Sequence, residues 1–263
     1  MRLWLIYALL SALCAAFVSI FGKVGLAGLD SSAATAVRAV IMALFLIGVV
    51  IAEGHAGSLP QVQLLQGRFC RLEKLSAEKH GSSLREVYAS PPENWTYLSI
   101  GPITDADGLE AYLAKLEQSA DPYWFAIVEQ ESGRAVGTVA LMRTDTANRT
   151  IEVGWVVYGE KLKRTRAATE AQFLLMQYVF ETLHYRRYEW KCDALNAPSC
   201  RAAERLGFTY EGTFRQDRIN RGRSRDTNWY SVIDSEWPER KRRFLDWLSD
   251  DNFDAQGRQK KPL

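Results

Sequence analysis

The pattern of apolar and charged positions divides this 263-residue chain into two parts. Residues 3–21 and 33–52 form two long apolar stretches, and Arg38 interrupts the second. Each stretch is about as long as a helix that crosses a bilayer core. The pattern therefore predicts a two-helix transmembrane hairpin over residues 1–57. Arg38 lies near a predicted helix end, where its side chain can reach the membrane interface.

Two other interpretations of the first sixty residues are open. A cleaved signal peptide would need a basic start, which Arg2 supplies, and small residues such as Ala12 to Ala16 after an apolar run. A second apolar stretch argues against it. A pair of helices buried in a soluble core is the other alternative, and the near absence of charge over two spans argues against that.

From residue 58 onward, apolar and polar positions alternate with the periods of strands and helices. A linker is expected at residues 55–60, and a polar, frayed tail at residues 249–263. The elements predicted between them are a strand at 67–75, helices at 76–90 and 104–117, strands at 124–130, 134–143 and 150–158, a helix from 168, and a strand at 188–195. This order predicts an α+β domain over residues 58–248, with a central mixed sheet flanked by helices.

Charge and cysteine content exclude several classes of function. The net charge is +2 and the pI about 8.3, so the chain has no overall nucleic-acid-binding signature. The basic runs at 218–225 and 239–243 have acidic neighbours, which makes a nucleic-acid partner unlikely on sequence grounds. The cysteines form no C-x-x-C pair and no zinc spacing; they are Cys14, Cys70, Cys192 and Cys200. We expect reduced thiols and no metal, with Cys192 as a packing residue.

A basic cluster stands directly before the helix predicted from residue 168. Its members are Lys161, Lys163, Arg164 and Arg166. A helix N-terminus carries a partial positive charge and unpaired N–H donors, so cations there are unfavourable unless an anion binds. Strand, basic turn and helix start together predict a phosphate-binding element. The alternative is a solvated turn whose basic side chains face water.

Motifs in the last third of the domain resemble those of the GNAT N-acetyltransferase superfamily, and most closely its ribosomal-protein N-terminal acetyltransferase branch. The matching residues are Thr169-Glu170-Ala171, Asn196 and Ser199, Leu206-Gly207-Phe208, Glu211-Gly212, Arg215, and Asp226-Thr227. The resemblance implies a GNAT-like sheet, with acetyl-CoA lying between strands 150–158 and 188–195. It also implies a set of cofactor-binding residues. These are Lys161, Leu162, Lys163, Arg164, Thr165, Arg166, Ala167, Ala168, Asn196 and Ser199. The family has glycines where Arg164 and Arg166 stand, so we hypothesise that charge replaces the usual backbone approach to phosphate.

The resemblance further implies direct acetyl transfer to an amine. Many members use a tyrosine as the acid at the position of Ala203, which leaves Ser199 as the candidate here, or else as a helix cap. Glu152 and Asp217 are the two candidates for the general base, directly or through water. Glu152 could instead be a salt-bridged strand residue.

The first apolar residues resemble the opening helices of EamA-type drug/metabolite transporters, through WLIYALLSAL, FGKVGL with Lys23, and Asp30 followed by ATAVRAV. We therefore expect an acetyl-CoA-dependent N-acetyltransferase that is held at the membrane, with lipid around residues 3–52 and residues 58–263 in the cytosol. Its acceptor would be a protein N-terminus or a small amine. The hairpin could be an anchor, a partner of transporter helices or a fused gene fragment. The alternative function is a non-catalytic acetyl-CoA-sensing subunit of a transporter.

Overall fold

A computed structural model describes residues 39, 40, 42, 43 and 57–263 of the chain. The chain divides into two compact units, Met1–His55 and Ala56–Leu263. Almost all of the transmembrane hairpin predicted over residues 1–57 lies outside the described residues. Within the described part of the chain, no helix combines the length and the apolar character that crossing a membrane requires. The following description concerns the second unit.

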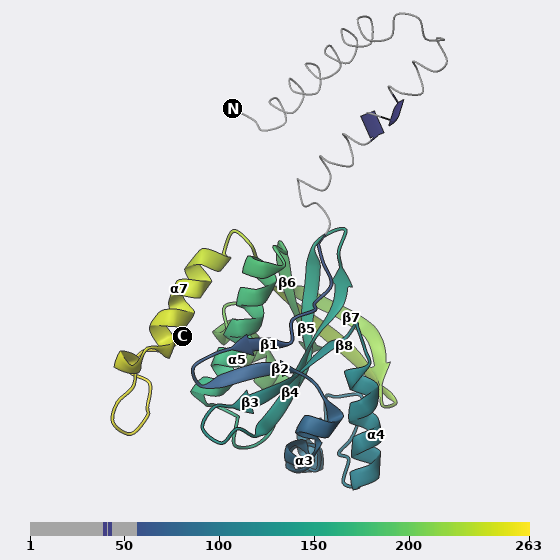
Figure 1. The fold of residues 1–263 in the computed structure, drawn as a ribbon, viewed down its shortest axis with the longest axis vertical. Coiled ribbons are helices and arrows are strands. Elements are labelled where there is room, and N and C mark those ends of the chain that lie inside the picture. Colours follow the sequence, from purple (N-terminus) through teal and green to yellow (C-terminus); the bar gives the residue numbers. More distant parts are fainter. Residues whose placement is uncertain (1–38, 41, 44–56) are drawn as a thin grey trace, which may run out of the picture. The chain divides into compact units, whose positions relative to one another are not determined.

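An eight-stranded mixed sheet forms the centre of this unit (Figure 1), in the order β1-β2-β3-β4-β5-β6-β8-β7. The strands are β1 (Leu64–Gln66), β2 (Cys70–Lys74), β3 (Tyr123–Glu129), β4 (Ala135–Asp145), β5 (Thr150–Tyr158), β6 (Arg187–Asp193), β7 (Thr209–Asn220) and β8 (Arg223–Ile233). Every neighbouring pair is antiparallel except β5 and β6, which are parallel. The predicted α+β class with a mixed sheet is confirmed.

Helices cover both faces of the sheet because β3 carries apolar residues on both of its faces. Trp124, Ala126 and Val128 belong to one core cluster, shared with α3 (Ala77–Tyr88) and α4 (Ala106–Glu117). Phe125 and Ile127 belong to the other, shared with α5 (Arg166–Gln177) and α7 (Trp237–Leu248). Successive strand side chains point to opposite faces, so a continuous apolar run such as WFAIV marks a strand buried on both sides.

Side-chain caps fix the starts of the helices near the cleft described below. Thr165 Oγ1 accepts from Ala168 N at the start of α5, and Asn196 Oδ1 accepts from Ser199 N at the start of α6 (Ala197–Arg205). Asp105 caps α4, where its side chain accepts from Gly108 N. Helix α5 continues into a π-helical turn, Tyr178–Thr182.

Glu170 explains part of the Thr-Glu-Ala motif that follows the basic turn. Its side chain is buried and accepts hydrogen bonds from the backbone N–H groups of Arg68, Phe69 and Cys70, at 2.6 to 2.8 Å. These bonds attach α5 to the turn between β1 and β2. The role of this glutamate is therefore to position the helix.

The sequence pattern missed strand β1 and helix α7. It was also wrong in predicting that the C-terminal tail is frayed. Helix α7 contains the basic run at 239–243, but its buried residues Trp237 and Phe244 pack against Phe173 of α5, at 6.0 and 5.5 Å between ring centroids. The segment after Leu248 is polar, as expected, yet it is not frayed. It forms a 3-10 turn, Asp250–Asn252, and an isolated bridge between Phe253 and Gln259, because buried Asn252 satisfies backbone groups on both sides of it.

Candidate functional site

Strands β5 and β6 separate part-way along their length. Their parallel pairing runs from Thr150 with Arg187 to Val153 with Trp190, and no pairing follows between the remaining residues of these described strands. The ends of β5 and β6 therefore diverge, and a cleft of about 1540 Å³ opens between them. This gap is the one that the resemblance implied for acetyl-CoA.

A β-bulge in β5 lies beside this opening. Ala140 of β4 pairs with Gly154 and Thr138 pairs with Val157, so a single β4 residue stands opposite Trp155 and Val156. Trp155 has a φ of 50°, which is unusual for a residue other than glycine. Bulges redirect the backbone and are common beside active sites. Both Trp155 and Val156 line the cleft.

Ser199 lies at the sheet end of the cleft, which we define as Glu152, Trp190, Lys191 and Ser199. Trp190 Nε1 donates to Ser199 Oγ at 3.0 Å, so the indole fixes the hydroxyl in position. The cap of helix α6 is Asn196 rather than Ser199. The sequence left Ser199 either as an acid or as a helix cap, and the capping alternative is wrong. A hydrogen bond with Ser199 also acts on the Cys192 thiol, where it lowers the pKa against the larger effect of burial.

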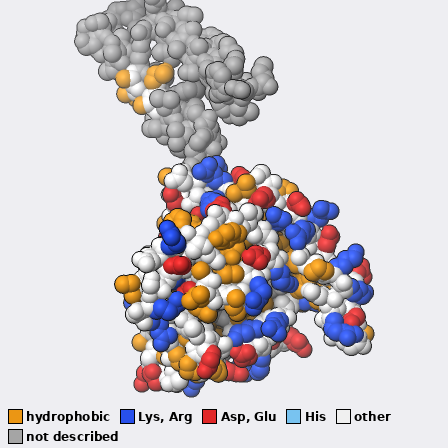
Figure 2. Space-filling view, turned by 180° about the vertical axis from the view of Figure 1, so that it is seen from behind, with side chains coloured by type: hydrophobic (Ala, Val, Ile, Leu, Met, Phe, Trp, Pro, Cys, Tyr) orange, Lys and Arg blue, Asp and Glu red, His pale blue; other side chains and the backbone are white. Residues whose placement is uncertain are grey.

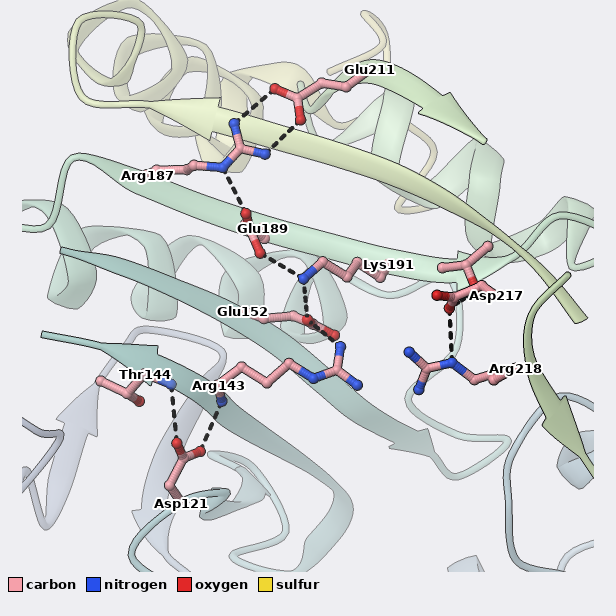
Figure 3. A network of polar contacts seen from close by, with 11 residues as sticks. Asp121, Arg143, Thr144, Glu152, Arg187, Glu189, Lys191, Glu211, Asp217 and Arg218 are labelled. Atoms are coloured by element: carbon pink, nitrogen blue, oxygen red, sulfur yellow. Dashed lines mark hydrogen bonds and ion pairs between the residues drawn. The ribbon is translucent and has the colours of Figure 1, made fainter. Parts of the chain in front are cut away.

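Glu152 stands at the same end and is almost fully buried, with 4% of its surface exposed. Arg143 Nη1 and Lys191 Nζ both contact its Oε2, at 2.7 and 3.0 Å (Figure 3). Lys191 Nζ also lies 2.8 Å from Glu189 and 3.7 Å from the centroid of the Trp229 ring. The salt-bridge interpretation of Glu152 is therefore correct, and Oε1 makes none of these contacts.

The polar network of Figure 3 continues along β6 from the ion pair of Glu152 with Lys191. Arg187 contacts Glu189 at 2.6 Å and forms a two-bonded pair with Glu211 on β7, whose Oε1 also accepts from Ser231. Hydrogen bonds from Arg187, acting against partial burial, hold the pKa of the Glu211 carboxyl below its usual range. The charges therefore alternate in sign from Arg143 to Glu211, so each buried charge has a partner.

The helix end of the cleft, which we define as Arg164, Thr165, Arg166, Phe253 and Arg258, is built from a turn and the C-terminal segment. Arg164 has a φ of 62°, the left-handed conformation that favours glycine. The turn therefore keeps the backbone shape of a glycine position while carrying a cationic side chain. Within the described chain, the backbone N–H groups of Arg166 and Ala167 donate to no other group, as expected for a helix's first turn.

The basic cluster is only partly directed at the cleft. Arg164 and Arg166 line it, and so does Lys163, whose Nζ contacts Glu160 at 2.6 Å and Asn94 at 2.8 Å. Arg166 is paired with Asp250 at 2.9 Å. Lys161 is exposed beside Glu86 and does not line the cleft.

The other sequence-derived candidates fall into two groups. Thr165, Ala168 and Asn196 line the cleft together with Glu152 and Ser199. Leu162 and Ala167 are buried in the core, and Asp217 is bound to Thr227 and Arg218 without lining the cleft. Hydrogen bonds from Thr227 and Arg218 outweigh partial burial and lower the pKa of Asp217.

The cysteines near the site are buried or half-buried thiols. Cys192 Sγ and Cys200 Sγ lie 3.6 Å apart, at hydrogen-bond distance and without a disulfide between them. Burial raises the pKa of Cys192 to about 12, which keeps it protonated and supports its assignment as a packing residue. In the part of the chain that the structure describes, no group of acidic, histidine or cysteine side chains could hold a metal ion.

Several residues at the site were missed by sequence reasoning. Gln172 on α5 is 1% exposed and lines the cleft; its Nε2 donates to Tyr158 OH at 2.8 Å, and its Oε1 is buried without a partner. Arg205, Trp247 and Phe253 also line the cleft. The polar Gln172 within the apolar face of α5 was a possible signal, whereas the other three come from elements distant in sequence.

Comparison with known proteins agrees with this geometry. Residues 71–209 match the family model described as the acetyltransferase (GNAT) domain. The chain belongs to the GNAT acetyltransferase family. It resembles the crystal structure of a GCN5-related N-acetyltransferase from Brucella melitensis at 46% identity and a TM-score of 0.77, covering 79% of this chain and 95% of that one.

Two curated Bacillus proteins are similar over shorter regions. The uncharacterized N-acetyltransferase p20 of Bacillus licheniformis is 29% identical over 153 residues, which is 57% of this chain and 85% of p20. YdaF of Bacillus subtilis, provisionally named a ribosomal N-acetyltransferase, is 30% identical over 105 residues, which is 40% of this chain and 57% of YdaF. The family match begins at residue 71, so the transporter-like interpretation of residues 1–55 stays a prediction.

GNAT acetyltransferases take their acetyl group from acetyl-CoA, and this cleft fits that molecule. The unpaired backbone N–H group of Arg166, which lines the cleft at the start of α5, suits a pyrophosphate. The orphaned Oε1 of Gln172 suits an amide N–H, which the pantetheine arm carries. The cleft therefore offers partners for both the anionic and the amide portions of acetyl-CoA.

Proposed function

We propose that this GNAT acetyltransferase acetylates a primary amine, either a protein N-terminus or a small amine, at the sheet end of the cleft. The observation that carries the proposal is the separation of β5 and β6 after Val153 and Trp190, with the Ser199 hydroxyl and a free Glu152 oxygen at the opening. Acetyl-CoA supplies an activated acetyl thioester when bound. The residues of this chain position the reactants and move protons.

Ser199 is the proposed acid. Trp190 Nε1 already donates to Ser199 Oγ, so the hydroxyl is oriented and its proton can be donated to the leaving sulfur. Ala203 occupies the position at which related enzymes carry an acidic tyrosine, and it is fully buried. The hydroxyl of Ser199 is thus the best-placed O–H group for this step.

Glu152 is the proposed base, acting through Oε1 on the acceptor amine, either directly or through one water. Two cations hold Oε2, which fixes the carboxylate and leaves Oε1 for the proton. Asp217 is the weaker candidate, because it does not line the cleft and both Thr227 and Arg218 bind its Oδ2. The bulge residues Trp155 and Val156 supply the proposed backbone N–H groups for the polarised carbonyl.

The wall of the cleft where the acceptor amine would enter favours an extended acceptor such as a peptide. Trp95, Tyr97 and Ile219 line it, and Ile219 is 79% exposed. Aromatic and apolar side chains lining a cleft suit contact with a peptide. The likeness to YdaF points in the same direction.

The test is acetyl transfer by the full chain to a panel of amines. The panel contains peptides with free N-termini of different first residues, the same peptides with blocked N-termini, and small amines such as spermidine. Release of CoA thiol measures turnover, and mass spectrometry locates the acetyl group. Turnover that depends on a free N-terminus supports the peptide acceptor. If the protein binds acetyl-CoA but acetylates none of these amines, the proposal is wrong.

We also propose that residues 1–57 hold the enzyme at a membrane with residues 58–263 in the cytosol. The support is the length of the apolar stretches 3–21 and 33–52 and the need for acetyl-CoA. Membrane fractionation tests the tether, using the full chain and a variant with charged substitutions in both stretches. Protease accessibility in sealed vesicles tests the orientation. Recovery of the full chain in the soluble fraction without detergent contradicts the tether.

A further inference from the structure

The C-terminal segment, residues 249–263, is a folded part of the molecule that lies outside the region matched to the family. One buried side chain organises it. Asn252 Nδ2 donates to the carbonyl oxygens of Trp247 and Lys261 at 3.1 Å, and Lys261 N donates back to Asn252 Oδ1 at 2.9 Å. The side-chain amide of Asn252 thereby joins the end of helix α7 to the last residues of the segment.

The loop between Phe253 and Gln259 has a defined shape. Arg258 N and Nε both donate to Asp254, each at 2.8 Å, and Gly257 closes the turn with a φ of 73°. Trp247 Nε1 donates to Gln259 Oε1 at 3.0 Å, which fixes the loop against α7. The loop is therefore held on both of its sides.

Arg166 attaches this segment to the start of helix α5. Its Nη1 lies 2.9 Å from Asp250 Oδ1, and its guanidinium lies 3.6 Å from the centroid of the Phe253 ring. Arg68 binds the other oxygen of Asp250, and its hydrogen bond is the main cause of a lowered pKa for that carboxyl. Arg166 thus has a structural partner, so its principal visible role is to hold the segment beside the turn at Arg164.

The same segment contributes a wall to the cleft. Phe253, Gly257, Arg258 and Gln259 line it, together with Trp247. From α6, Arg205 lies over the Trp247 ring at 4.7 Å and donates to Thr169 at 3.2 Å. Aromatic rings and guanidinium groups therefore alternate at this end of the cleft.

We propose that residues 249–263 complete the acetyl-CoA site by binding its 3′-phosphorylated adenosine, an inference that rests on the proposed function. If the thioester lies at the sheet end and the pyrophosphate at the start of α5, the nucleoside must lie beyond the turn. There the cleft continues to Phe253 and Arg258. Guanidinium planes and aromatic rings stack on a base, and a guanidinium binds phosphate oxygens in a fork.

The proposal is tested by comparing two acetyl donors with the full chain. Acetyl-CoA carries the phosphorylated adenosine, and S-acetyl-4′-phosphopantetheine lacks it. We expect Arg258→Ala to raise the KM for acetyl-CoA about tenfold, the effect of one charge-assisted hydrogen bond, while kcat stays unchanged. The KM for S-acetyl-4′-phosphopantetheine should not change. Lys261→Ala is the matched control, because Lys261 belongs to the same segment without lining the cleft.

A second measurement distinguishes loss of a phosphate contact from a disturbance of the loop by Arg258→Ala. With the unmodified protein, removing the 3′-phosphate from acetyl-CoA should raise KM, and Arg258→Ala should abolish that difference. If Arg258→Ala and the parent treat all donors alike while acetyl transfer proceeds, the inference is wrong and the proposed function stands. If the parent neither binds acetyl-CoA nor transfers the acetyl group, both are wrong.

Discussion

The two ends of the cleft are built in different ways. At the sheet end, Glu152 and Lys191 lie on β5 and β6, and their positions follow from the strand register and from buried ion pairs. At the helix end, Arg164 and Arg166 lie on a turn, and the opposite wall comes from a segment 84 residues further along the chain, through the pair of Arg166 with Asp250. Changes at the sheet end should therefore alter the chemical step, and changes at the helix end should alter binding.

The mixed distribution of charge on one face of the molecule contrasts with both ends of the cleft. On the face shown in Figure 2, basic and acidic side chains are interspersed. Such a surface has no extended single-sign field for a nucleic acid backbone.

The largest expected effect is at Glu152. Glu152→Gln should lower kcat about 100-fold, because the amide cannot take a proton from the acceptor amine. Glu189→Gln is the matched control, since it also removes a carboxylate from Lys191 but does not line the cleft. Steady-state kinetics over a range of pH separates the two variants. An equal loss in both would mean that Glu152 acts only by holding Lys191.

Ser199→Ala should have the next largest effect, a fall in kcat of roughly 10- to 100-fold with little change in KM. The comparison is Asn196→Ala, which removes the cap of α6 and should cost about 1 kcal/mol of stability. Kinetics and urea unfolding of both variants distinguish the roles. If Asn196→Ala lowers kcat as much as Ser199→Ala does, the position of α6, and not the hydroxyl, controls the rate.

Arg164→Gly tests whether charge or backbone shape matters at the helix end. Glycine relieves the left-handed strain and should stabilise the fold by about 1 kcal/mol, since an L-residue pays roughly that cost there. Loss of the guanidinium should weaken acetyl-CoA binding about tenfold. Calorimetry and thermal unfolding measure both, with Lys161→Ala as the control that should change neither. Tighter binding in Arg164→Gly would contradict the idea that charge replaces backbone approach.

The smallest effect concerns a site away from both ends. Burial raises the pKa of Glu73, but hydrogen bonds from Lys79, Arg71 and His80 outweigh it and lower the value to about 2 from 4.5. The folded state therefore binds the proton less tightly than the unfolded state. This contribution to stability is complete above pH 4.5 and is lost as the pH falls toward 2.

Thermal unfolding between pH 7 and pH 3 measures this dependence. The parent should lose stability of the order of 1 kcal/mol over that range through Glu73, and Glu73→Gln should lose less. Acetyl transfer at pH 7 should not change in this variant. A fall in kcat would show that the two cleft ends are coupled to β2.

The sequence by itself determined most of the fold. Strand 150–158 and the antiparallel hairpin before it depend on local periodicity, which a sequence pattern carries. Strand β1 and helix α7 were missed because three residues are too few for a period, and because the charged run at 239–243 obscures the buried spacing of Trp237, Phe244 and Trp247.

The tertiary structure alone decided which candidates share a cleft. The sequence offered Glu152, Asp217 and Ser199 together as catalytic candidates. In the fold, β5 and the start of α6 bring Glu152 and Ser199 to the cleft, whereas Asp217 on β7 is bound to Thr227 and Arg218. The basic cluster also divides: Arg166, in the first turn of α5, pairs with Asp250, whereas Lys161, in the turn before that helix, is exposed. Long-range pairings of this kind depend on how the elements pack, and no local pattern encodes them.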